Sequence, residues 1–405
     1  MLRTAYILLW FPVPTETFIF REVVNLKRYG LPITVFSLYG PWRKNLSPEM
    51  AAAAGAVERL GMWSLPRLLL ALAVWLWRKP GVSLGILRSF VFRRWSGLEK
   101  TGENIWALLA GFHLARRFEA LEIQHIHAPW ASGPATAAWV ASRLMGAPFS
   151  FTARAWDIYP PDALIKEKVQ DAAFVRSETA VNVAHLKAIT GAADAKFHVT
   201  YNGMPLAQTV EAGLTMTPPY QLLAMGRFVA KKGYDVLMEA AGILAGRGVP
   251  FVLTMAGDGG LRGALERQAQ DLGIADKVRF PGFLTYDAVS AAFAGADVFL
   301  MPCVVAASSD RDGIPTVIME ALMHRVPVIS TPVSGIPELI RDGDTGLMVP
   351  ERDPVALADA IQRLVADRDL ALRLAESGRA QVRQQFDAER NHRGILALYD
   401  TIGRA

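Results

Sequence analysis

The chain has 405 residues, of which 52% are hydrophobic and 20% charged, with one cysteine and a formal net charge of +5. This length exceeds one ordinary hydrophobic core and predicts two domains of roughly 200 residues each, while the composition excludes a disordered chain. A single cysteine excludes an internal disulfide and is typical of a reducing compartment. Because Cys303 adjoins an apolar run, we expect a buried structural thiol.

The N-terminal residues predict a buried strand and not an export signal. The stretch MLRTAYILLWFPVPTETF has one early charge and a short apolar run that Pro12 and Pro14 interrupt. The longest apolar run, Leu68–Trp77, is too short to cross a bilayer, which takes roughly 20 residues. We therefore expect neither a leader peptide nor a spanning helix.

The two halves of the chain differ in charge. Residues 1–200 carry 23 Lys and Arg against 14 Asp and Glu, whereas the remainder carries 20 against 24. Leu65–Trp95 combines Leu, Trp and Phe with six Lys or Arg residues, which is typical of helices lying in an anionic membrane surface. The alternative is a pair of core helices with solvated basic ends. We expect no nucleic-acid partner, because the basic residues alternate with aliphatic ones and form no recognised motif.

The first half alternates short β-rich runs with helical runs. Strands are expected at 5–11, 32–39, 123–128, 148–154, 172–177 and 196–203, and helices at 15–30, 134–145 and 178–189. Strands separated by helices of this length predict a parallel, doubly wound sheet. Residues 203–221 are small, polar and proline-rich, and we interpret them as a linker.

The same alternation begins again after the linker and predicts a second doubly wound domain. Its strands are expected at 221–228, 251–259, 278–284, 297–303 and 345–350, and its helices at 234–248, 261–273, 286–296 and 354–366. A long amphipathic region follows at 371–402, which we expect to be interrupted at Gly378. The predicted fold class is α/β with two Rossmann-like domains, 1–205 and 206–384.

Basic and glycine-rich loops follow the first two strands of the second domain. In open parallel sheets ligands bind beyond the carboxyl ends of the strands, so these loops are candidate binding elements. Arg227 and Lys232, with Lys231 beside it, could neutralise a pyrophosphate, although a solvated basic turn is the alternative. Gly257 in AGDGGLR could let the backbone approach a ligand, although this turn lacks the dinucleotide fingerprint.

The stretch DRDGIPTVIME places two carboxylates around the start of a helix. We expect the backbone N–H groups of Gly313, Ile314 and Thr316 to bind an anion or sugar hydroxyls there. Pro315 is expected in the first helical turn. Asp312 lies in the loop and Glu320 further along the helix, so both could face one elongated ligand as acceptors from neutral hydroxyls. The alternatives are that Asp312 only caps the helix, or that Asp310 and Asp312 hold a divalent metal.

Two histidines lie on one predicted strand of the first domain. We expect His125 and His127 to point to opposite faces of this strand, which would keep them from chelating one metal. His127, nearer the strand end, is the better candidate for a ligand cleft, with a satisfied buried histidine as the alternative.

These segments together resemble the family 4 retaining glycosyltransferases, which have the GT-B fold, over nearly the whole chain. The resemblance is carried by FPVPTETFIFREVVNL, HIHAPWASGPATAAWVA, FSFTARAWDIY, YNG, GRFVAKKG, AGDGGLR, FPGFL and DGIPTVIMEALMHRVPVISTPVSGIPELIRDGDTGLMVP. TETF and SGIPELI are most similar to transferases of bacterial exopolysaccharide assembly, including the colanic-acid type. The resemblance implies two domains facing a central cleft, with the last helix, about 385–405, packing back on the first domain.

The resemblance also implies roles for individual residues. Asp312 would accept from hydroxyls of the donor sugar and Glu320 from the ribose, while Arg227 and Lys232 would bind the diphosphate. The segment near the nucleobase would be Gly282, Phe283 and Leu284, and the acceptor side would include Thr15 and Glu16, with His127 and Arg154 in catalytic positions. Many members carry His where this chain has Arg154, and Arg cannot act as a neutral base, although it can stabilise a leaving phosphate.

The sequence thus predicts a retaining, nucleotide-sugar-dependent hexosyltransferase of cell-surface polysaccharide biosynthesis. We expect a UDP- or GDP-sugar donor, a glycan acceptor that is lipid-linked, no cofactor and no metal, and a peripheral position on the inner face of the cytoplasmic membrane. The alternative is a catalytically degenerate, membrane-associated scaffold of the same fold. A dehydrogenase is disfavoured because the dinucleotide fingerprint is missing.

Overall fold

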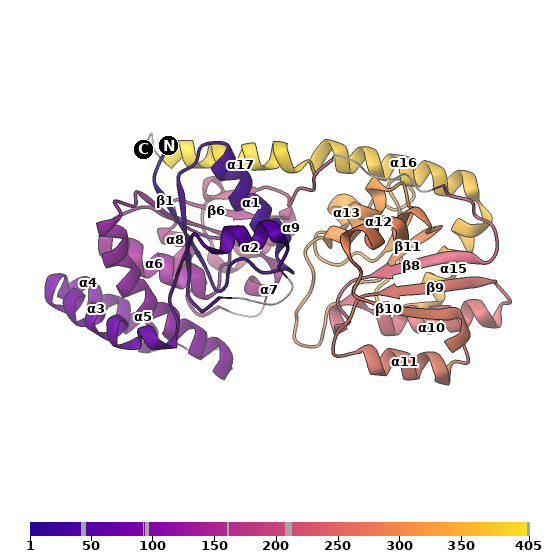
Figure 1. Ribbon diagram of the computed structural model, residues 1–405, viewed down its shortest axis with the longest axis horizontal. Coiled ribbons are helices and arrows are strands. Elements are labelled where there is room, and N and C mark those ends of the chain that lie inside the picture. The colour runs from indigo at the N-terminus through magenta and orange to yellow at the C-terminus, as the bar shows by residue number, and fades with distance from the viewer. Residues whose placement is uncertain (42–45, 92, 94–96, 160–161, 207–212, 403–405) are drawn as a thin grey trace. The chain divides into compact units, whose positions relative to one another are not determined.

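The computed structural model describes residues 1–41, 46–91, 93, 97–159, 162–206 and 213–402. The chain forms two compact units, Met1–Tyr201 with Glu389–Ala405 (unit 1) and Asn202–Ala388 (unit 2) (Figure 1). Each unit carries a parallel sheet with helices, which confirms the predicted α/β class with two Rossmann-like domains. The sequence had placed the divisions after residues 205 and 384.

Within the described residues, unit 1 forms a seven-stranded sheet in the order β3-β2-β1-β4-β5-β6-β7, and each neighbouring pair is parallel. The strands are β1 (Thr4–Leu8), β2 (Ile33–Ser37), β3 (Val57–Arg59), β4 (His125–Ala128), β5 (Phe149–Ala153), β6 (Phe174–Ser177) and β7 (Phe197–Val199). Because all strands run one way, their carboxyl ends and the loops that follow them share one edge of the sheet.

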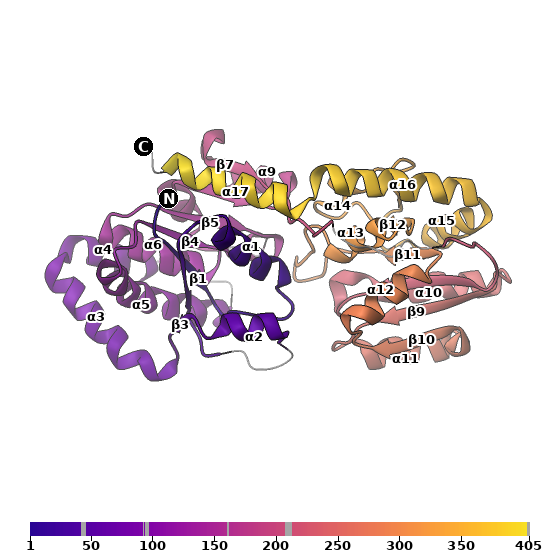
Figure 2. The ribbon, with the colours of Figure 1, turned by 45° about the horizontal axis from the view of Figure 1, so that its top comes forward.

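The helices of unit 1 vary in length from one turn to six. They are α1 (Thr17–Arg28), α2 (Pro48–Ala54), α3 (Leu65–Arg78), α4 (Pro80–Val91), α5 (Leu98–Ala120), α6 (Gly133–Met145), α7 (Ala155–Ile158), α8 (Ile165–Asp171), α9 (Ala180–Thr190) and α17 (Ala388–Ile402). The helices lie in two layers, and each layer has its own buried apolar cluster against the sheet. Helices α3 to α6 pack on one face of the sheet, and α1 and α17 pack on the other (Figure 2).

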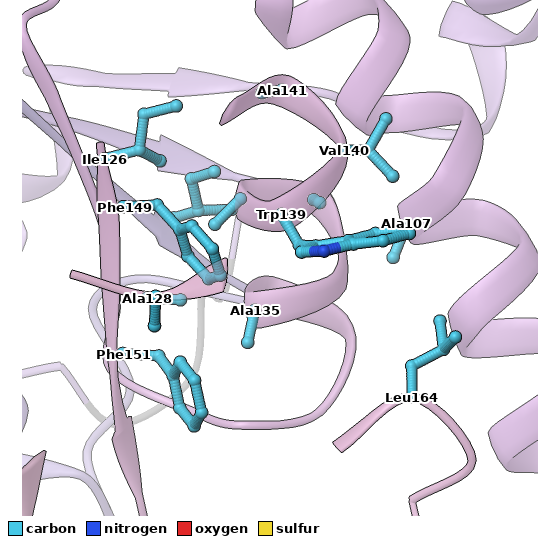
Figure 3. Packing of buried hydrophobic residues seen from close by; sticks show 14 of the residues in the cluster. Ala107, Ile126, Ala128, Ala135, Trp139, Val140, Ala141, Phe149, Phe151 and Leu164 are labelled. Carbon is cyan, nitrogen blue, oxygen red and sulfur yellow. The ribbon is translucent and has the colours of Figure 1, made fainter. Parts of the chain in front are cut away.

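The larger cluster is built around α5 and α6, which lie in close contact. Gly111 of α5 makes this possible, because a Cβ there would lie 2.6 Å from the Cβ of Val140. Figure 3 shows Trp139 and Val140 of α6 on the side of Ala107, and Phe149 of β5 in the same cluster. Trp139 is almost fully buried and donates its indole N–H at 2.8 Å to the exposed Asp171, so this buried side chain has a polar partner at the edge of the core.

A buried ion pair lies within the opposite layer. Arg176 of β6 contacts Glu22 of α1 at 2.5 Å, and these two side chains are 2% and 3% exposed. Tyr6 of β1 extends the network through its hydroxyl, which lies 3.4 Å from Glu22 and 2.6 Å from the hydroxyl of Tyr399 on α17. The last helix is therefore connected to the centre of the sheet in unit 1 by a hydrogen bond as well as by apolar packing from Ile395.

In the part of the chain that the structure describes, unit 2 forms a six-stranded parallel sheet in the order β10-β9-β8-β11-β12-β13. The strands are β8 (Tyr220–Met225), β9 (Phe251–Ala256), β10 (Val278–Gly282), β11 (Val298–Met301), β12 (Val328–Ser330) and β13 (Leu347–Met348). The helices are α10 (Tyr234–Gly246), α11 (Arg262–Asp271), α12 (Tyr286–Ala294), α13 (Thr316–Met323), α14 (Ile336–Leu339), α15 (Pro354–Ala366) and α16 (Arg368–Gln385).

The expected interruption at Gly378 is wrong. Helix α16 continues through this residue and ends at Gln385. A Cβ at Gly378 would lie 2.4 Å from Cδ2 of Leu322 and 2.8 Å from the carbonyl oxygen of Thr345. The glycine therefore lets α16 approach α13 closely, and its low helix propensity is outweighed by this packing.

We predict that Glu22→Gln and Arg176→Met each destabilise unit 1 by about 3–5 kcal/mol, because each leaves one buried charge without its partner. The double variant should lose less than the sum of the single losses, since it leaves neither charge. All ten tryptophans lie in unit 1, so urea unfolding followed by tryptophan fluorescence reports on this unit selectively.

The matched control is Glu122→Gln, which removes a surface ion pair with Arg3 whose side chains are 76% and 57% exposed. That change should cost less than about 1 kcal/mol. Burial opposes ionisation of Glu22, but the pair with Arg176 holds the pKa of Glu22 below its ordinary value. The stabilisation is therefore present above the ordinary Glu value and is lost as the pH falls through the lowered one. Losses of equal size for Glu22→Gln and Glu122→Gln would contradict the assignment.

Candidate functional site

The order of strands in unit 2 creates a natural binding position between β8 and β11. The chain adds β9 and β10 on one side of β8, and then β11, β12 and β13 on the other. Loops that follow β8 and β11 therefore lead to helices on opposite faces of the sheet, and ligands of open α/β sheets bind at such a reversal. The predicted donor residues Arg227 and Lys232 follow β8, and Asp312 follows β11.

Glycines bring the loops after β8 and β9 into backbone contact. Gly226 donates its N–H to the carbonyl of Ala256 at 2.9 Å, and Phe228 donates to the carbonyl of Asp258 at the same distance. Gly257 has a φ of +135°, and a Cβ there would lie 2.0 Å from the carbonyl oxygen of Gly226. Gly257 thus has a structural reason to be glycine, in addition to the ligand approach that the sequence suggested.

Two lysines and two carboxylates meet at the reversal. The ammonium of Lys232 lies 2.8 Å from Asp312, and that of Lys231 lies 3.4 Å from Asp312 and 3.1 Å from Asp310. Gly233 makes the turn after the lysines at a φ of +65°, where a Cβ would lie 2.0 Å from the carbonyl oxygen of Pro302. The lysine pair is therefore held directly against the loop that follows β11.

The electrostatics of this cluster favour the charged forms. Burial tends to raise the pKa of Asp312, but Lys232 and Lys231 lower it further, so the pKa lies below its ordinary value. Burial likewise tends to lower the pKa of Lys232, while Asp312 raises it above the ordinary lysine value. At neutral pH the cluster thus holds an ionised carboxylate between two ammonium groups. Lys231 was noted in the sequence only as a neighbour, and its contact with both carboxylates depends on the β8–β11 adjacency.

A thiol and a phenol border the cluster without carrying charge. Burial, followed by the charge of Asp312, raises the pKa of Cys303 to about 12, and its sulfur lies 3.8 Å from that carboxylate. Burial also raises the pKa of Tyr234 well above its ordinary value. The buried, neutral thiol agrees with the structural role expected for Cys303, because the thiolate is the reactive form.

The other predicted donor residues lie on neighbouring elements of unit 2. Arg227 is exposed and close enough to Lys232 to lower the pKa of that lysine. Gly282 ends β10, and Phe283 after it is 81% exposed, whereas Leu284 is half-buried. Their proposed proximity to a nucleobase stays a prediction.

Helix α13 carries the second predicted carboxylate but begins later than expected. Its first residue is Thr316, while Pro315 has extended backbone angles at the N-cap and so lies outside the first turn. Gly313 and Ile314 consequently precede the helix. Glu320 lies one turn inside α13 and is half-buried. The expectation that Asp312 binds hydroxyls of the donor sugar and Glu320 binds the ribose stays a prediction.

The predicted face assignment of the two histidines in unit 1 is wrong. Side chains two positions apart on a strand point to the same face, and both rings contact Phe174 and Tyr399. Ser150 lies between them, 3.0 Å from His125 and 2.8 Å from His127. Burial lowers the pKa of His125 to about 3 and that of His127 well below its ordinary value, so both are neutral.

The structure places His127 in the core and not at a surface. It is fully buried, and its second ring nitrogen lies 3.2 Å from the hydroxyl of Thr152. This environment is that of the satisfied buried histidine, which was the stated alternative to a role in the cleft. A direct contact of His127 with substrate is therefore disfavoured.

Arg154 follows β5 and is enclosed within unit 1. It is 3% exposed and forms an ion pair with Glu178, which follows β6. Its guanidinium lies 4.4 Å from the ring centre of Phe18 and 5.4 Å from that of Trp130. Glu178 already compensates this charge. Glu178 could not be predicted from the sequence, because its contact with Arg154 depends on the pairing of β5 with β6.

Thr15 and Glu16 lie between β1 and α1 of unit 1, where Thr15 is exposed and Glu16 is half-buried.

A buried carboxyl, Asp157 of α7, follows β5 at the same sheet edge and accepts the backbone N–H of Arg154 at 2.7 Å and that of Ala131. Burial raises the pKa of Asp157 to about 7, against the lowering effect of these N–H groups. Its two oxygens hold the loops after β4 and β5 together.

Among the described residues, no three or more His, Cys, Asp or Glu side chains lie together in a group that could hold a metal ion. The same part of the chain contains no helix that is long and apolar enough to cross a membrane.

Comparison with known proteins identifies the C-terminal part of the chain. Residues 211–381 match the family Glycosyl transferases group 1. This matched segment lies within unit 2 and is similar to glycosyl transferases of group 1. It is 34% identical over 185 residues to WcaL of Salmonella typhimurium, a glycosyltransferase assigned to colanic acid biosynthesis. It is 33% identical over 184 residues to the amylovoran biosynthesis glycosyltransferase AmsK of Erwinia amylovora.

Each of these two matches covers 45% of this chain, and they cover 46% and 45% of the relatives, so they span just under half of either protein. The whole chain is similar in fold to Anabaena HepE, solved with UDP and glucose, with a TM-score of 0.70 at 16% identity over 99% of this chain and 100% of that one. The predicted GT-B fold and the resemblance to transferases of exopolysaccharide assembly are confirmed.

We predict that Gly257→Ala weakens both the folding of unit 2 and the binding of nucleotide. The added Cβ must displace the carbonyl of Gly226, and the alanine must adopt a φ that is unfavourable for it. Together these two effects cost on the order of 2–4 kcal/mol. Gly260→Ala is the matched control in the same turn, because its Cβ would meet nothing within 4 Å. Thermal unfolding and calorimetric titration with UDP and GDP measure the two effects, and equal behaviour of both variants would contradict the packing argument.

Proposed function

We propose that this chain transfers a sugar, with retention of anomeric configuration, from a nucleotide-diphosphate sugar to a glycan acceptor. The observation that supports this most is the cluster of Lys231, Lys232 and Asp312 at the strand reversal of a domain matched to glycosyltransferases. Two ammonium groups suit a diphosphate, and a carboxylate suits the hydroxyls of a sugar. We propose a UDP- or GDP-sugar as the donor; HepE was solved with UDP.

The geometry suggests how the donor enters the cluster. Without ligand, Asp312 is the partner of both lysines. A diphosphate can take over these ammonium groups, with exposed Arg227 as a third cation, and the carboxylate is then available to accept from the sugar hydroxyls. Because lysine and arginine supply the positive charge, we propose that transfer needs no divalent metal.

The transfer itself follows the mechanism implied by the resemblance. The bond between the anomeric carbon and the phosphate oxygen breaks, and the acceptor oxygen forms a bond to this carbon on the same face. The acceptor proton passes to the leaving phosphate, so the products are the extended glycan and a nucleoside diphosphate. In this proposal the protein contributes positioning and charge stabilisation, and Asp312 and Glu320 bind opposite ends of the donor.

We also propose that the acceptor is a lipid-linked glycan of cell-surface polysaccharide biosynthesis, used at the inner face of the cytoplasmic membrane. Helices α3 and α4 of unit 1 support this. Residues 65–91 include four Lys or Arg and no Asp or Glu. The buried side of α3 carries Leu68, Ala71 and Trp75, whereas Leu70 is 60% and Trp77 is 85% exposed.

This arrangement combines features of both sequence interpretations. One side of α3 packs in the core, and the other presents apolar side chains to solvent beside the exposed cations Arg67 and Arg88. Figures 1 and 2 show α3 and α4 side by side at one end of unit 1. Arg93 forms an ion pair with Glu167, and residues 92, 94 and 95 of the predicted segment lie outside the described residues.

We predict that Glu320→Gln mainly weakens nucleotide binding, whereas Asp312→Asn mainly slows sugar transfer and leaves the affinity for free nucleotide near that of the unaltered protein. A hydrogen bond to a charged group contributes roughly 1.5–3 kcal/mol, so each loss should be about 10- to 150-fold in its own parameter. Calorimetry with UDP and GDP measures binding, and transfer or slow hydrolysis of a nucleotide-sugar panel measures turnover.

All of these assays are run in EDTA. Turnover that is lost in EDTA and restored by Mn²⁺ or Mg²⁺ would instead favour Asp310 and Asp312 as metal ligands. Equal loss of nucleotide affinity in both variants would show that the two carboxylates serve the same end of the donor. The matches to biosynthetic transferases do not favour the scaffold alternative, which predicts no turnover in the unaltered protein.

We predict that the chain binds vesicles containing anionic phospholipid and that binding weakens as salt rises. Arg67→Glu with Arg88→Glu should lower binding roughly tenfold or more, since each cation near such a surface contributes about 1 kcal/mol. Leu70→Ser with Trp77→Ser should lower it at every salt concentration. Val355→Ser, at an exposed apolar position of unit 2, is the control. If the chain stays in the supernatant when such vesicles are sedimented at low salt, membrane contact is contradicted.

A further inference from the structure

Four segments that follow strands at the carboxyl edge of the unit 1 sheet each carry a large aromatic side chain. Trp10 follows β1, Tyr39 follows β2, Trp130 follows β4 and Trp156 follows β5. These strands are consecutive in the sheet, in the order β2-β1-β4-β5. Neighbouring strands lie about 4.8 Å apart, so the four attachment points extend over roughly 15 Å. We refer to these four residues as the aromatic row.

Three members of the row, Trp10, Tyr39 and Trp130, are held in place by contacts within unit 1. Trp10 stacks on Tyr39 with ring centres 4.6 Å apart, and Tyr39 stacks on Trp106 of α5 at 6.3 Å. The indole N–H of Trp106 donates to the carbonyl of Leu38 at 2.9 Å, which connects the stack to the end of β2. Trp130 is fixed by Arg154 and by an edge contact with Phe18. The rings of Trp10, Tyr39 and Trp130 are therefore positioned before any ligand binds.

Two members of the row remain open to solvent although they are large and apolar. Trp10 is 37% and Trp156 is 41% exposed. A single exposed tryptophan needs no explanation, but two at the binding edge of one sheet, with half-buried aromatic side chains after the neighbouring strands, indicate a ligand with apolar faces. Trp156 lies in α7 and the other three lie in loops after strands, so the row is carried by different elements from the apolar side of α3.

Polar groups accompany the rings. Glu103 of α5 accepts the backbone N–H of Gly133 at 2.7 Å and lies near Tyr39, whose pKa is raised by burial and then by the charge of Glu103. Thr15 and Glu16 follow β1 at the same carboxyl edge of the sheet. Aromatic faces with a few hydrogen-bonding groups beside them suit a sugar, whose ring has an apolar C–H face and hydroxyls at its rim.

We propose that the aromatic row binds the pyranose rings of a neutral glycan, with Trp10 as the main stacking platform. The assignment of this glycan as the acceptor rests on the proposed function, whereas sugar binding by the row does not. A row of platforms predicts that disaccharides bind more tightly than monosaccharides, because a second ring can stack on a second aromatic side chain.

The test uses the full chain with maltose, cellobiose, lactose and the methyl α-glycosides of glucose and galactose. Saturation-transfer NMR should show transfer from the protein to C–H protons on one face of the sugar ring, with stronger binding of at least one disaccharide. Trp10→Ala should weaken this binding roughly tenfold, and Trp10→Phe should retain part of it, because an aromatic face is still present.

The matched control is Trp77→Ala, which removes an even more exposed tryptophan from α3. Trp77→Ala should leave sugar binding unchanged and weaken vesicle binding, and Trp10→Ala should do the reverse. Thermal unfolding confirms that each variant folds, and Trp156→Ala provides a second test should Trp10→Ala unfold. If no disaccharide receives saturation, or if Trp10→Ala and Trp156→Ala bind it like the unaltered chain, the proposal is wrong.

Nucleotide titration separates this outcome from failure of the proposed function. A chain that binds the disaccharides through Trp10 but binds neither UDP nor GDP would have a sugar-binding row without the proposed donor chemistry. Alternatively, the chain could bind nucleotide and turn over a donor while substitutions in the aromatic row leave sugar binding unchanged. That result would retain the proposed function and overturn this inference. Loss of disaccharide binding in Trp77→Ala alone would assign the sugar site to α3 instead.

Discussion

The reversal of strand order in each parallel sheet is the constraint on which the rest of the structure depends. Both sheets begin at an interior strand, extend to one side, and then return to extend to the other. This order separates two loops at the centre of the carboxyl edge and places their residues opposite each other. In unit 2 these loops bring Lys231 and Lys232 to Asp312. In unit 1 the corresponding edge carries Trp10 after β1 and Trp130 after β4.

Within unit 2, close backbone packing and charge pairing depend on each other. Gly257 and Gly233 allow the loops after β8, β9 and β11 to approach at distances that a Cβ would forbid. That approach buries the lysines, and burial would disfavour their charge if no carboxylate were present. Asp312 restores the charged state of Lys232. The glycines therefore set the geometry, and the carboxylate makes this geometry electrostatically tolerable.

The sequence predicts the elements better than the contacts between them. Alternation of strands and helices was sufficient for the two α/β domains, because that pattern is local and repeats along the chain. The faces of His125 and His127 could also have been obtained locally, since a strand has a period of two. By contrast, the Arg154–Glu178 pair and the Lys231 contacts join segments whose adjacency follows from sheet order. Gly378 was misread because its close approach to Leu322 is a tertiary contact.

The paired state of Asp312 offers a physical link between donor binding and chemistry. As long as the carboxylate is bound to Lys231 and Lys232, its oxygens are occupied by ammonium groups. A diphosphate carries more negative charge than one carboxylate and can take over these partners, which leaves the carboxylate to accept from a neutral hydroxyl. An uncharged sugar alone provides no such exchange, because it cannot replace the carboxylate at the ammonium groups. Under the proposed function, Asp312 therefore becomes available to a sugar hydroxyl only when the phosphates are bound.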